Sequence, residues 1–208
     1  MKIMAVSDRV MENLYVSNLR EKFPNIDLII GCGDLPFYYL EFLVSALDAP
    51  MVYVRGNHDG GVQYTTDGRR LTGVQGGQDI HGRVVMVSDL ILAGLEGSMR
   101  YRPYAELMYS ETEMIGQVAR MMPIFLWNRQ RYGRALDILV AHSPPWRIHD
   151  GRDIAHTGFK IFRTLLTYLK PKYLLHGHIH IYRQDTVRVT QFAQTTVLNV
   201  YPYLVFNF

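Results

Sequence analysis

The chain has 208 residues, of which 48% are hydrophobic and 20% are charged, a composition typical of a folded globular protein and not of a disordered one. The formal net charge of +3 is only mildly basic, which is too weak a signal to indicate a nucleic-acid-binding protein. Cys32 is the only cysteine, so an intrachain disulfide and a zinc-ribbon site are both excluded.

The first ten residues, MKIMAVSDRV, reach Asp8 too early to contain the apolar core of a signal peptide. No long uncharged apolar run follows, so no membrane partner is expected. A reducing, cytoplasmic location is therefore the default expectation. The chain length and the absence of repeats or linkers predict a single domain over residues 1–208.

Five short apolar runs predict β-strands, and each one ends in a cluster of polar residues. In chain order the runs are KIMAV, DLII, MVYV, DILV and KYLL. They are followed in turn by SD, GCGD, RGNHDGG, AHSPPW and HGHIH. Helical patterns lie between several of these runs. The alternation of strand and helix favours an α/β sheet that contains parallel strands.

The first three predicted helices follow from apolar spacing and from end signals. Apolar residues within 15–23 fit one face of a first helix, and residues 37–47 predict a second. Ser110 with Glu113 predicts a capping box at the start of a third helix. Pro123 should kink or end that third helix, because proline lacks the N–H that the helix needs.

The remaining elements include strands that break the alternation. A fourth helix is predicted over residues 159–169, with Thr157 as its cap. Residues 82–97 and the tail 185–208 are typical of strand pairs. We therefore expect a mixed sheet, or two sheets packed as a sandwich, flanked by helices. Pro202 predicts that the last strand lies at an edge or contains a bulge.

Three histidines crowd the end of the fifth run, in the stretch LLHGHIHIYR. His176, His178 and His180 alternate with other residues, so they face the same side as long as the segment stays extended. A bound metal cation would make such crowding favourable, since neutral imidazole is a common metal ligand. A solvated histidine patch is the alternative, and this stretch alone does not choose between them.

Other polar residues at the predicted strand ends extend this cluster. In open α/β folds, ligands bind beyond the carboxyl ends of the parallel strands. The mixed oxygen and nitrogen donors there suit manganese, iron or zinc better than a soft metal. The residues concerned are Asp8, Asp34, Asn57, His58, Asp59 and His142, in addition to the three histidines.

The ordered series of Asp8, GD, GNHD, AH and GHIH resembles the calcineurin-like metallophosphoesterase superfamily over nearly the whole chain. The stretches GCGDLP, AGLEGSMRY and RIHDGRDIAHTGF are similar to small prokaryotic members. The resemblance implies an α/β fold of the α+β type, a four-layer αββα sandwich with mixed sheets. It also implies a metal-dependent phosphoesterase, which hydrolyses phosphate monoesters or diesters by attack of a metal-bridging hydroxide.

The same resemblance implies a role for each matching residue, with two divalent metal ions as cofactors. Asp34 would bridge the two metals, and His58 would donate a proton to the leaving group, with Asp59 orienting it. His176 lies outside the motif and is interpreted as a packed histidine or one that supports the ligands. The remaining ligands would be Asp8 and His180 for the first metal, and Asn57, His142 and His178 for the second.

One position departs from the family pattern. The family begins with Asp, any residue and His, whereas this chain has Asp8, Arg9 and Val10. Valine cannot bind a metal, so the first site loses an imidazole and is expected to be weaker. Three protein ligands and a water still suffice for a catalytic metal. Glu12 or Asn13 could reach the site, although each is interpreted first as the beginning of a helix.

The residues that would select a substrate are less well defined. Cys32 lies between two glycines and is interpreted as a small core residue and not as a nucleophile. Arginines in the expected loops could bind a phosphate through charge-assisted hydrogen bonds. Arg100 and Arg147 are the candidates, with Arg102 and His149 as further possibilities nearby.

Two functions from different classes are therefore considered. The first is a hydrolase acting on a small phosphate ester, with monoester, diester and cyclic nucleotide all open. The second is a scaffold of the same fold that binds protein partners, as a retromer subunit that resembles this superfamily does. His58 favours the enzyme, because a scaffold has no chemical need for it. The oligomeric state is left open.

Overall fold

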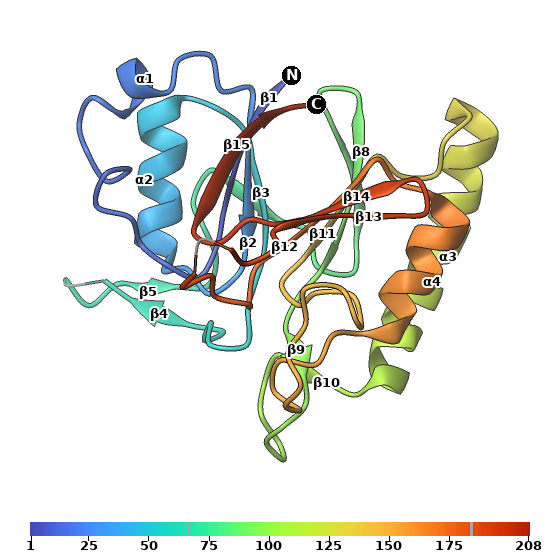
Figure 1. Cartoon of the computed structure of the whole chain (residues 1–208). Coiled ribbons are helices and arrows are strands. Elements are labelled where there is room, and N and C mark those ends of the chain that lie inside the picture. The colour runs from blue at the N-terminus through green and yellow to red at the C-terminus, as the bar shows by residue number, and fades with distance from the viewer. Residues whose placement is uncertain (66, 184) are drawn as a thin grey trace.

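The computed structural model describes residues 1–65, 67–183 and 185–208. Figure 1 shows two sheets between outer helices. The first sheet has the strand order β15-β1-β2-β3-β6. Strands β1, β2, β3 and β6 run parallel, and β15 is an antiparallel edge strand, as Pro202 predicts. The bounds are β1 (Lys2–Val6), β2 (Leu28–Cys32), β3 (Met51–Val54), β6 (Gly77–Asp79) and β15 (Tyr203–Asn207).

The second sheet has the strand order β13-β14-β12-β11-β8-β7. Its four central strands are parallel, and β7 and β13 close its edges as antiparallel strands. The predicted mixed sheets are thus confirmed. The bounds are β7 (Val84–Val87), β8 (Leu90–Leu95), β11 (Ile138–Ala141), β12 (Tyr173–His176), β13 (Val189–Phe192) and β14 (Thr195–Asn199). Two small ribbons complete the strands: β4 (Gln63–Tyr64) with β5 (Arg70–Leu71), and β9 (Ser98–Met99) with β10 (Met108–Tyr109).

The helices lie outside the two sheets. Their bounds are α1 (Leu19–Lys22), α2 (Phe37–Leu47), α3 (Glu111–Tyr132) and α4 (Lys160–Leu169). In Figure 1, α1 and α2 lie beside the first sheet, and α3 and α4 beside the second. No helix among the described residues is both long and apolar enough to cross a bilayer.

Alternating side chains divide the apolar core into three layers. In β1, Ile3 and Ala5 face the other sheet, whereas Met4 and Val6 face α2. The second sheet alternates in the same way, with Val140 between the sheets and the neighbouring strand residues against the helices. This period of two gives the αββα layering that the resemblance implies. We propose that residues 1–208 form one domain, because the two sheets share the middle layer.

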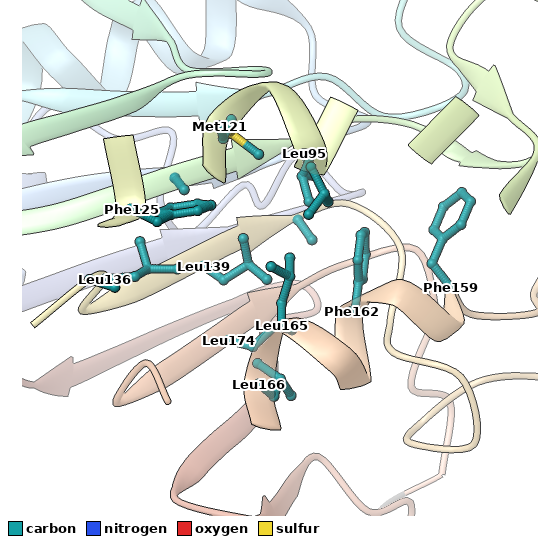
Figure 2. Packing of buried hydrophobic residues seen from close by; sticks show 14 of the residues in the cluster. Leu95, Met121, Phe125, Leu136, Leu139, Phe159, Phe162, Leu165, Leu166 and Leu174 are labelled. Atoms are coloured by element: carbon teal, nitrogen blue, oxygen red, sulfur yellow. The ribbon is translucent and has the colours of Figure 1, made fainter. Parts of the chain in front are cut away.

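The layer under α3 and α4 is shown in Figure 2. Phe125 of α3 and Phe162 and Leu166 of α4 are fully buried against Leu139 of β11 and Leu174 of β12. Burying a side chain of this size contributes roughly 1.5–3 kcal/mol. This packing therefore holds the second sheet in place, and with it the strand ends from which the following loops start.

The first helix is shorter than predicted. Residues 15–23 were expected to be helical, but only Leu19–Lys22 are. The chain instead forms turns, in which the N–H groups of Leu14 and Tyr15 both donate to the carbonyl of Met11. Leu14 and Leu19 are both fully buried. The turns thus bury both leucines. In a continuous helix, residues five positions apart would not lie on the same face.

The third helix has the predicted capping box but does not end at its proline. Ser110 and Glu113 form the predicted capping box. The helix does not end at Pro123, however, and continues to Tyr132. Proline removes the bond to the carbonyl four residues earlier, that of Ala119. Ala119 is exposed, so water can satisfy that carbonyl and the helix can continue.

The start of the fourth helix differs from the prediction. Thr157 does not cap it, because its hydroxyl donates to the carbonyl of Asp153 at 2.8 Å. The carboxylate of Glu111 on α3 instead accepts the N–H groups of Lys160 at 3.0 Å and of Ile161 at 2.7 Å. A cap supplied by another helix leaves no signal in the local sequence.

Glu111→Ala should therefore destabilise the protein, because two N–H groups at the start of α4 lose their acceptor. We expect the free energy of unfolding to fall by about 1 kcal/mol, as for the loss of other N-terminal caps. Urea denaturation measures this change. Glu111→Gln is the matched control, since it keeps one oxygen and should lose less. Equal stability of Glu111→Ala and the native protein would contradict the cap.

Candidate metal centre

The ends of the parallel strands bring the candidate ligands together. Asp8 follows β1, Asp34 follows β2, Asn57 follows β3, His142 follows β11, and His178 lies just after β12. Strands that run parallel end at the same edge of their sheet. In Figure 1 the two termini lie at the top, and β1 runs from the N-terminus toward the opposite end of the first sheet. Side chains from both sheets therefore meet at one end of the sandwich.

Three of these residues form a compact group of ligand atoms. One atom each of Asp34, His142 and His178 lies within 4.8 Å of the other two. Asp34 Oδ2 is 3.3 Å from His142 Nε2, and Asn57 Oδ1 is 3.1 Å from the same nitrogen. His142 is fully buried, and His178 and Asn57 are nearly so. These four residues are the ones that the resemblance assigns to the second metal, with Asp34 as the bridge.

The hydrogen bonds around His142 leave acceptor atoms of three side chains facing one another. His142 Nδ1 lies 2.8 Å from the carbonyl oxygen of Cys32. A carbonyl only accepts, so Nδ1 carries a hydrogen, and Nε2 of the neutral ring is a bare lone pair. Asn57 Nδ2 donates to Tyr101 at 3.3 Å, which directs Asn57 Oδ1 at that lone pair. Acceptors from three side chains thus converge, and only a proton or a metal ion can join them.

The pKa values of His142 and Asp34 also favour a positive charge between these two side chains. Burial alone would lower the pKa of His142, but the Asp34 carboxylate raises it to about 9. Burial works to raise the pKa of Asp34, yet His142 and the His58 N–H bring it well below its usual range. In the metal-free protein a proton on His142 therefore supplies the positive charge. A metal that replaces it would release that proton.

His178 has one ring nitrogen in a hydrogen bond and one that is free among the described residues. Its Nε2 lies 2.8 Å from the carbonyl of Ala155 and so donates to it, which leaves Nδ1 as the free ligand atom. Burial and the nearby His142 lower the pKa of His178 to about 4. The ring of His156 lies beside it, with centroids 5.3 Å apart. A buried neutral histidine with its far nitrogen engaged is typical of a metal ligand.

Asp8 and His180 form a second pair, in which the Asp8 side chain is buried and His180 is partly exposed. His180 Nε2 is 3.5 Å from Asp8 Oδ1, and the side chain of His180 is 40% exposed. Both oxygens of Asp8 also accept the backbone N–H of His178 at 3.0 Å. The hydrogen bond to Asp8 raises the pKa of His180. Of the pair assigned to the first metal, only His180 is therefore open to solvent.

The backbone at the centre is adapted to close approach. Asp8, Asp34 and His178 have φ values of 62°, 55° and 65°, in the left-handed region that side chains rarely adopt. A Cβ on Gly56 would collide with the Asp34 carboxylate, and one on Gly177 would collide with that of Asp8. Such strain persists only where surrounding structure enforces it, and it is concentrated at functional sites.

His58 and Asp59 directly follow Asn57 in the chain and make different contacts. His58 is exposed, and its backbone N–H donates to Asp34 Oδ1 at 2.8 Å. Asp59 Oδ2 accepts the N–H groups of Asp34 and Gly56, both at 2.8 Å. Burial raises the pKa of Asp59 to about 6. Asp59 thus joins the loops after β2 and β3, and its expected orientation of the His58 ring stays a prediction.

Val10, at the position where the family pattern has histidine, packs against the apolar core. Val10 is partly buried against the apolar layer under α2. Glu12 and Asn13 are both exposed, and the Asn13 amide donates to the hydroxyl of Tyr203 at 3.3 Å. The contacts of Asn13 therefore direct it toward β15 and not toward Asp8.

The two candidate phosphate-binding arginines have other contacts in the described structure. Arg100 donates to the carbonyl of Met108 at 3.0 Å and to the carboxylate of Glu113 at 2.9 Å. Arg147 is exposed, and its guanidinium lies over the ring of Trp146 at 4.2 Å. These contacts give Arg100 a role at the start of α3. Substrate binding by either arginine stays a prediction.

Several supporting residues were missed by reasoning from the sequence. Tyr101 orients Asn57, and the carbonyl of Ala155 orients His178. Ser7 and Ser143 each precede or follow a proposed ligand, and each has a buried hydroxyl that lacks a hydrogen-bond partner among the described residues. Unpaired buried hydroxyls beside ligands suit a centre that holds further ions or water. Only the nearness of Ser7 and Ser143 to motif residues could have indicated them.

A charged pair behind the centre was also missed. Glu96 is buried at the end of β8, and Arg55 at the end of β3 donates to it at 3.0 Å. Tyr109 donates to the other oxygen of Glu96 at 2.7 Å. Because Arg55 directly precedes Gly56 and Asn57, this pair ties the ligand loop of the first sheet to the second sheet.

Comparisons with known proteins agree with this fold. A model of the calcineurin-like phosphoesterase family matches residues 1–182. The structure of TT1561 of Thermus thermophilus is similar over 96% of this chain and 88% of its own, with a TM-score of 0.63 and 14% identity. A second solved structure has the same TM-score at 12% identity, with coverages of 96% and 90%. At these identities the two structures show the fold alone.

One curated relative matches a shorter stretch. It is described as an orotate phosphoribosyltransferase of Fusobacterium nucleatum subsp. nucleatum and is 24% identical over 123 residues. The match covers 59% of this chain and about half, 52%, of the relative.

The family match spans most of the chain, so the chain belongs to the calcineurin-like phosphoesterase family. The resemblance and the fold class expected from the sequence are confirmed. The family generally consists of phosphoesterases that bind divalent metals, and the cluster of Asp34, His142 and His178 fits such a metal.

Asp34→Asn should remove metal from the protein, because Asn lacks the charge that holds a cation beside His142. We expect binding of added Mn²⁺ to weaken more than about 100-fold, beyond the loss typical of residues that only orient a ligand. Elemental analysis after dialysis measures it. Asp48→Asn, at the exposed end of α2, is the matched control. Full metal content in Asp34→Asn would show that the assignment is wrong.

Metal titration should resolve two unequal steps, because the site of Asp8 and His180 is one imidazole short and His180 is partly exposed. Val10→His should tighten the weaker step by about tenfold, or 1.4 kcal/mol. Calorimetry on the metal-free protein measures both steps. Val10→Ala loses the same packing without adding a ligand and should leave the weak step unchanged. Two steps of equal affinity in the native protein would contradict the expected asymmetry.

Proposed function

We propose that the protein is a metal-dependent hydrolase of small phosphate esters, either monoesters or diesters. The observation that carries this proposal is the convergence of Asp34, Asn57, His142 and His178 on one point. Asn57, His142 and His178 are buried. In each histidine one ring nitrogen bonds to a backbone carbonyl, so the other nitrogen of the neutral ring is free to bind a metal. Without a metal ion or a proton on His142 such an arrangement is unfavourable, because buried acceptors would face each other unpaired.

Four residues would hold the inner metal, and Asp8 with His180 would hold the outer one, with Asp34 shared. Two divalent cations of the manganese, iron or zinc kind would neutralise the charge of the phosphate and lower the pKa of water near to neutrality. The protein's own contribution is to fix the ligands. Asp59 fixes the loops of Asp34 and Gly56, and Tyr101 fixes the amide of Asn57.

His58 is proposed as the proton donor to the leaving oxygen. Its backbone is fixed by the bond to Asp34, and its ring is exposed at the mouth of the centre. A histidine side chain is a common general acid for a leaving oxygen. No covalent intermediate is needed, since Cys32 is buried and burial raises the pKa of its thiol.

The direct experiment is hydrolysis by metal-free protein after addition of Mn²⁺, Fe²⁺ or Zn²⁺. Nitrophenyl phosphate, bis(nitrophenyl) phosphate and cyclic nucleotides cover the three classes of ester. We expect product release that depends on metal and that Asp34→Asn abolishes. Metal binding without hydrolysis of any ester would overturn the enzyme and favour the scaffold function.

His58→Gln should separate binding from chemistry. The variant keeps the backbone N–H that Asp34 accepts, so its metal content should equal that of the native protein. Loss of a general acid typically slows catalysis by about 10²–10⁴-fold. We expect that loss for alkyl esters and a much smaller one for nitrophenyl esters, whose leaving group needs no proton. Measured kcat values on both esters test this, and equal losses would count against proton donation.

A further inference from the structure

His176 is the histidine of the closing cluster that the metal centre does not use. It is fully buried, at the end of β12. Its Nε2 lies 2.9 Å from Nδ1 of His149, and its Nδ1 lies 2.9 Å from the carbonyl oxygen of Gly177. His149 Nε2 in turn lies 2.8 Å from the hydroxyl of Thr190. Four groups thus form one chain of hydrogen bonds from the second sheet to the metal loop.

The direction of each bond in this chain follows from the Gly177 carbonyl, provided that both rings are neutral. The Gly177 carbonyl can only accept, so His176 Nδ1 carries a hydrogen. In a neutral ring His176 Nε2 is then an acceptor, and His149 Nδ1 must donate to it. His149 Nε2 is left as an acceptor, to which the hydroxyl of Thr190 donates. The opposite direction would require a cationic His176, buried beside a centre that itself binds cations, which is unfavourable.

At its inner end, this chain of hydrogen bonds holds the peptide group between Gly177 and His178. The oxygen of the Gly177–His178 peptide accepts from His176 Nδ1 and from the Ile179 N–H. The N–H of the same peptide donates to both oxygens of Asp8 at 3.0 Å. His178 has a φ of 65°. If this peptide turned over, its carbonyl would face the Asp8 carboxylate, and the His178 ring would move.

The outer end of the chain reaches a pocket of about 480 Å³ on the far side of the metal loop. His149, Thr190 and Ile179 are among the residues that line it. His149 has a φ of 62°, so its backbone is also in the left-handed region. The ring is therefore fixed by both of its nitrogens in a strained loop, which is typical of a residue kept for its position.

We propose that His149 and His176 are positioning residues, whose neutral, one-directional hydrogen-bond chain holds the Gly177–His178 peptide in the orientation that Asp8 and His178 need to bind metal. The proposal rests on the proposed metal centre for its consequence. Its first part, the chain itself, is a property of the metal-free protein and can be tested without metal or substrate.

The first test is long-range ¹H–¹⁵N correlation NMR of the metal-free protein, which distinguishes the tautomers of each ring. His149 and His176 should both carry hydrogen on Nδ1 and none on Nε2. A hydrogen on Nε2 of His176, in either the neutral or the cationic ring, would overturn the proposal. This result does not depend on whether the protein is an enzyme.

The second test replaces the donor. His149→Phe keeps a ring but loses the N–H, and we expect Co²⁺ affinity to fall by about 10–100-fold, as for other residues that orient a ligand. His149→Asn places an amide N–H near the position of Nδ1 and should recover most of that affinity. The Co²⁺ absorption spectrum should change in the Phe variant and return in the Asn variant.

The outcomes of the second test are distinct from those of the hydrolysis assay. Native Co²⁺ affinity in His149→Phe, or no recovery in a folded His149→Asn, would overturn the positioning role. If the Phe variant fails to fold, the tautomers of the native protein and the Asn variant still decide. A native protein that binds Co²⁺ as expected but hydrolyses no ester would contradict the proposed function alone.

Discussion

The metal centre depends on one constraint, the convergence of lone pairs from two sheets on a point that holds no hydrogen-bond donor of its own. His142 is central to it, because its Nδ1 is committed to the Cys32 carbonyl and its Nε2 faces Asp34 and Asn57. In water each acceptor would find its own donor. Buried together, they are stable only around a shared positive charge, either a proton on His142 or a metal ion.

The fold supplies this convergence at a cost in backbone strain. Asp8, Asp34 and His178 all adopt the left-handed conformation at the residue where the chain leaves a strand. Each such residue typically costs about 1–3 kcal/mol. The apolar layers on both faces of each sheet hold the strand ends in place, and the buried pair of Arg55 and Glu96 joins the two sheets next to the Asn57 loop. Rigid packing therefore offsets the strain at the loops.

The sequence predicted what is encoded locally or by ordered motifs. The strands KIMAV and MVYV and the capping box of Ser110 follow from periodicity and from short-range chemistry, and all are present. The cap of α4 by Glu111 and the short α1 were not predicted, because they depend on contacts between distant segments. The same holds for the centre: the motif residues could be identified, but the supporting residues such as Tyr101 could not. Their identity depends on which loop lies beside which ligand.

The substitution at position 10 shows how packing and metal binding are coupled in this chain. The family pattern has a histidine there, whereas Val10 contributes to the apolar layer under α2. The loss falls on the site of Asp8 and His180, where Asp8 already accepts the His178 N–H with both oxygens. That bond lets Asp8 support His178 even when it holds no metal. The inner group of Asp34, Asn57, His142 and His178 is therefore the part of the centre whose geometry is least affected by the missing imidazole.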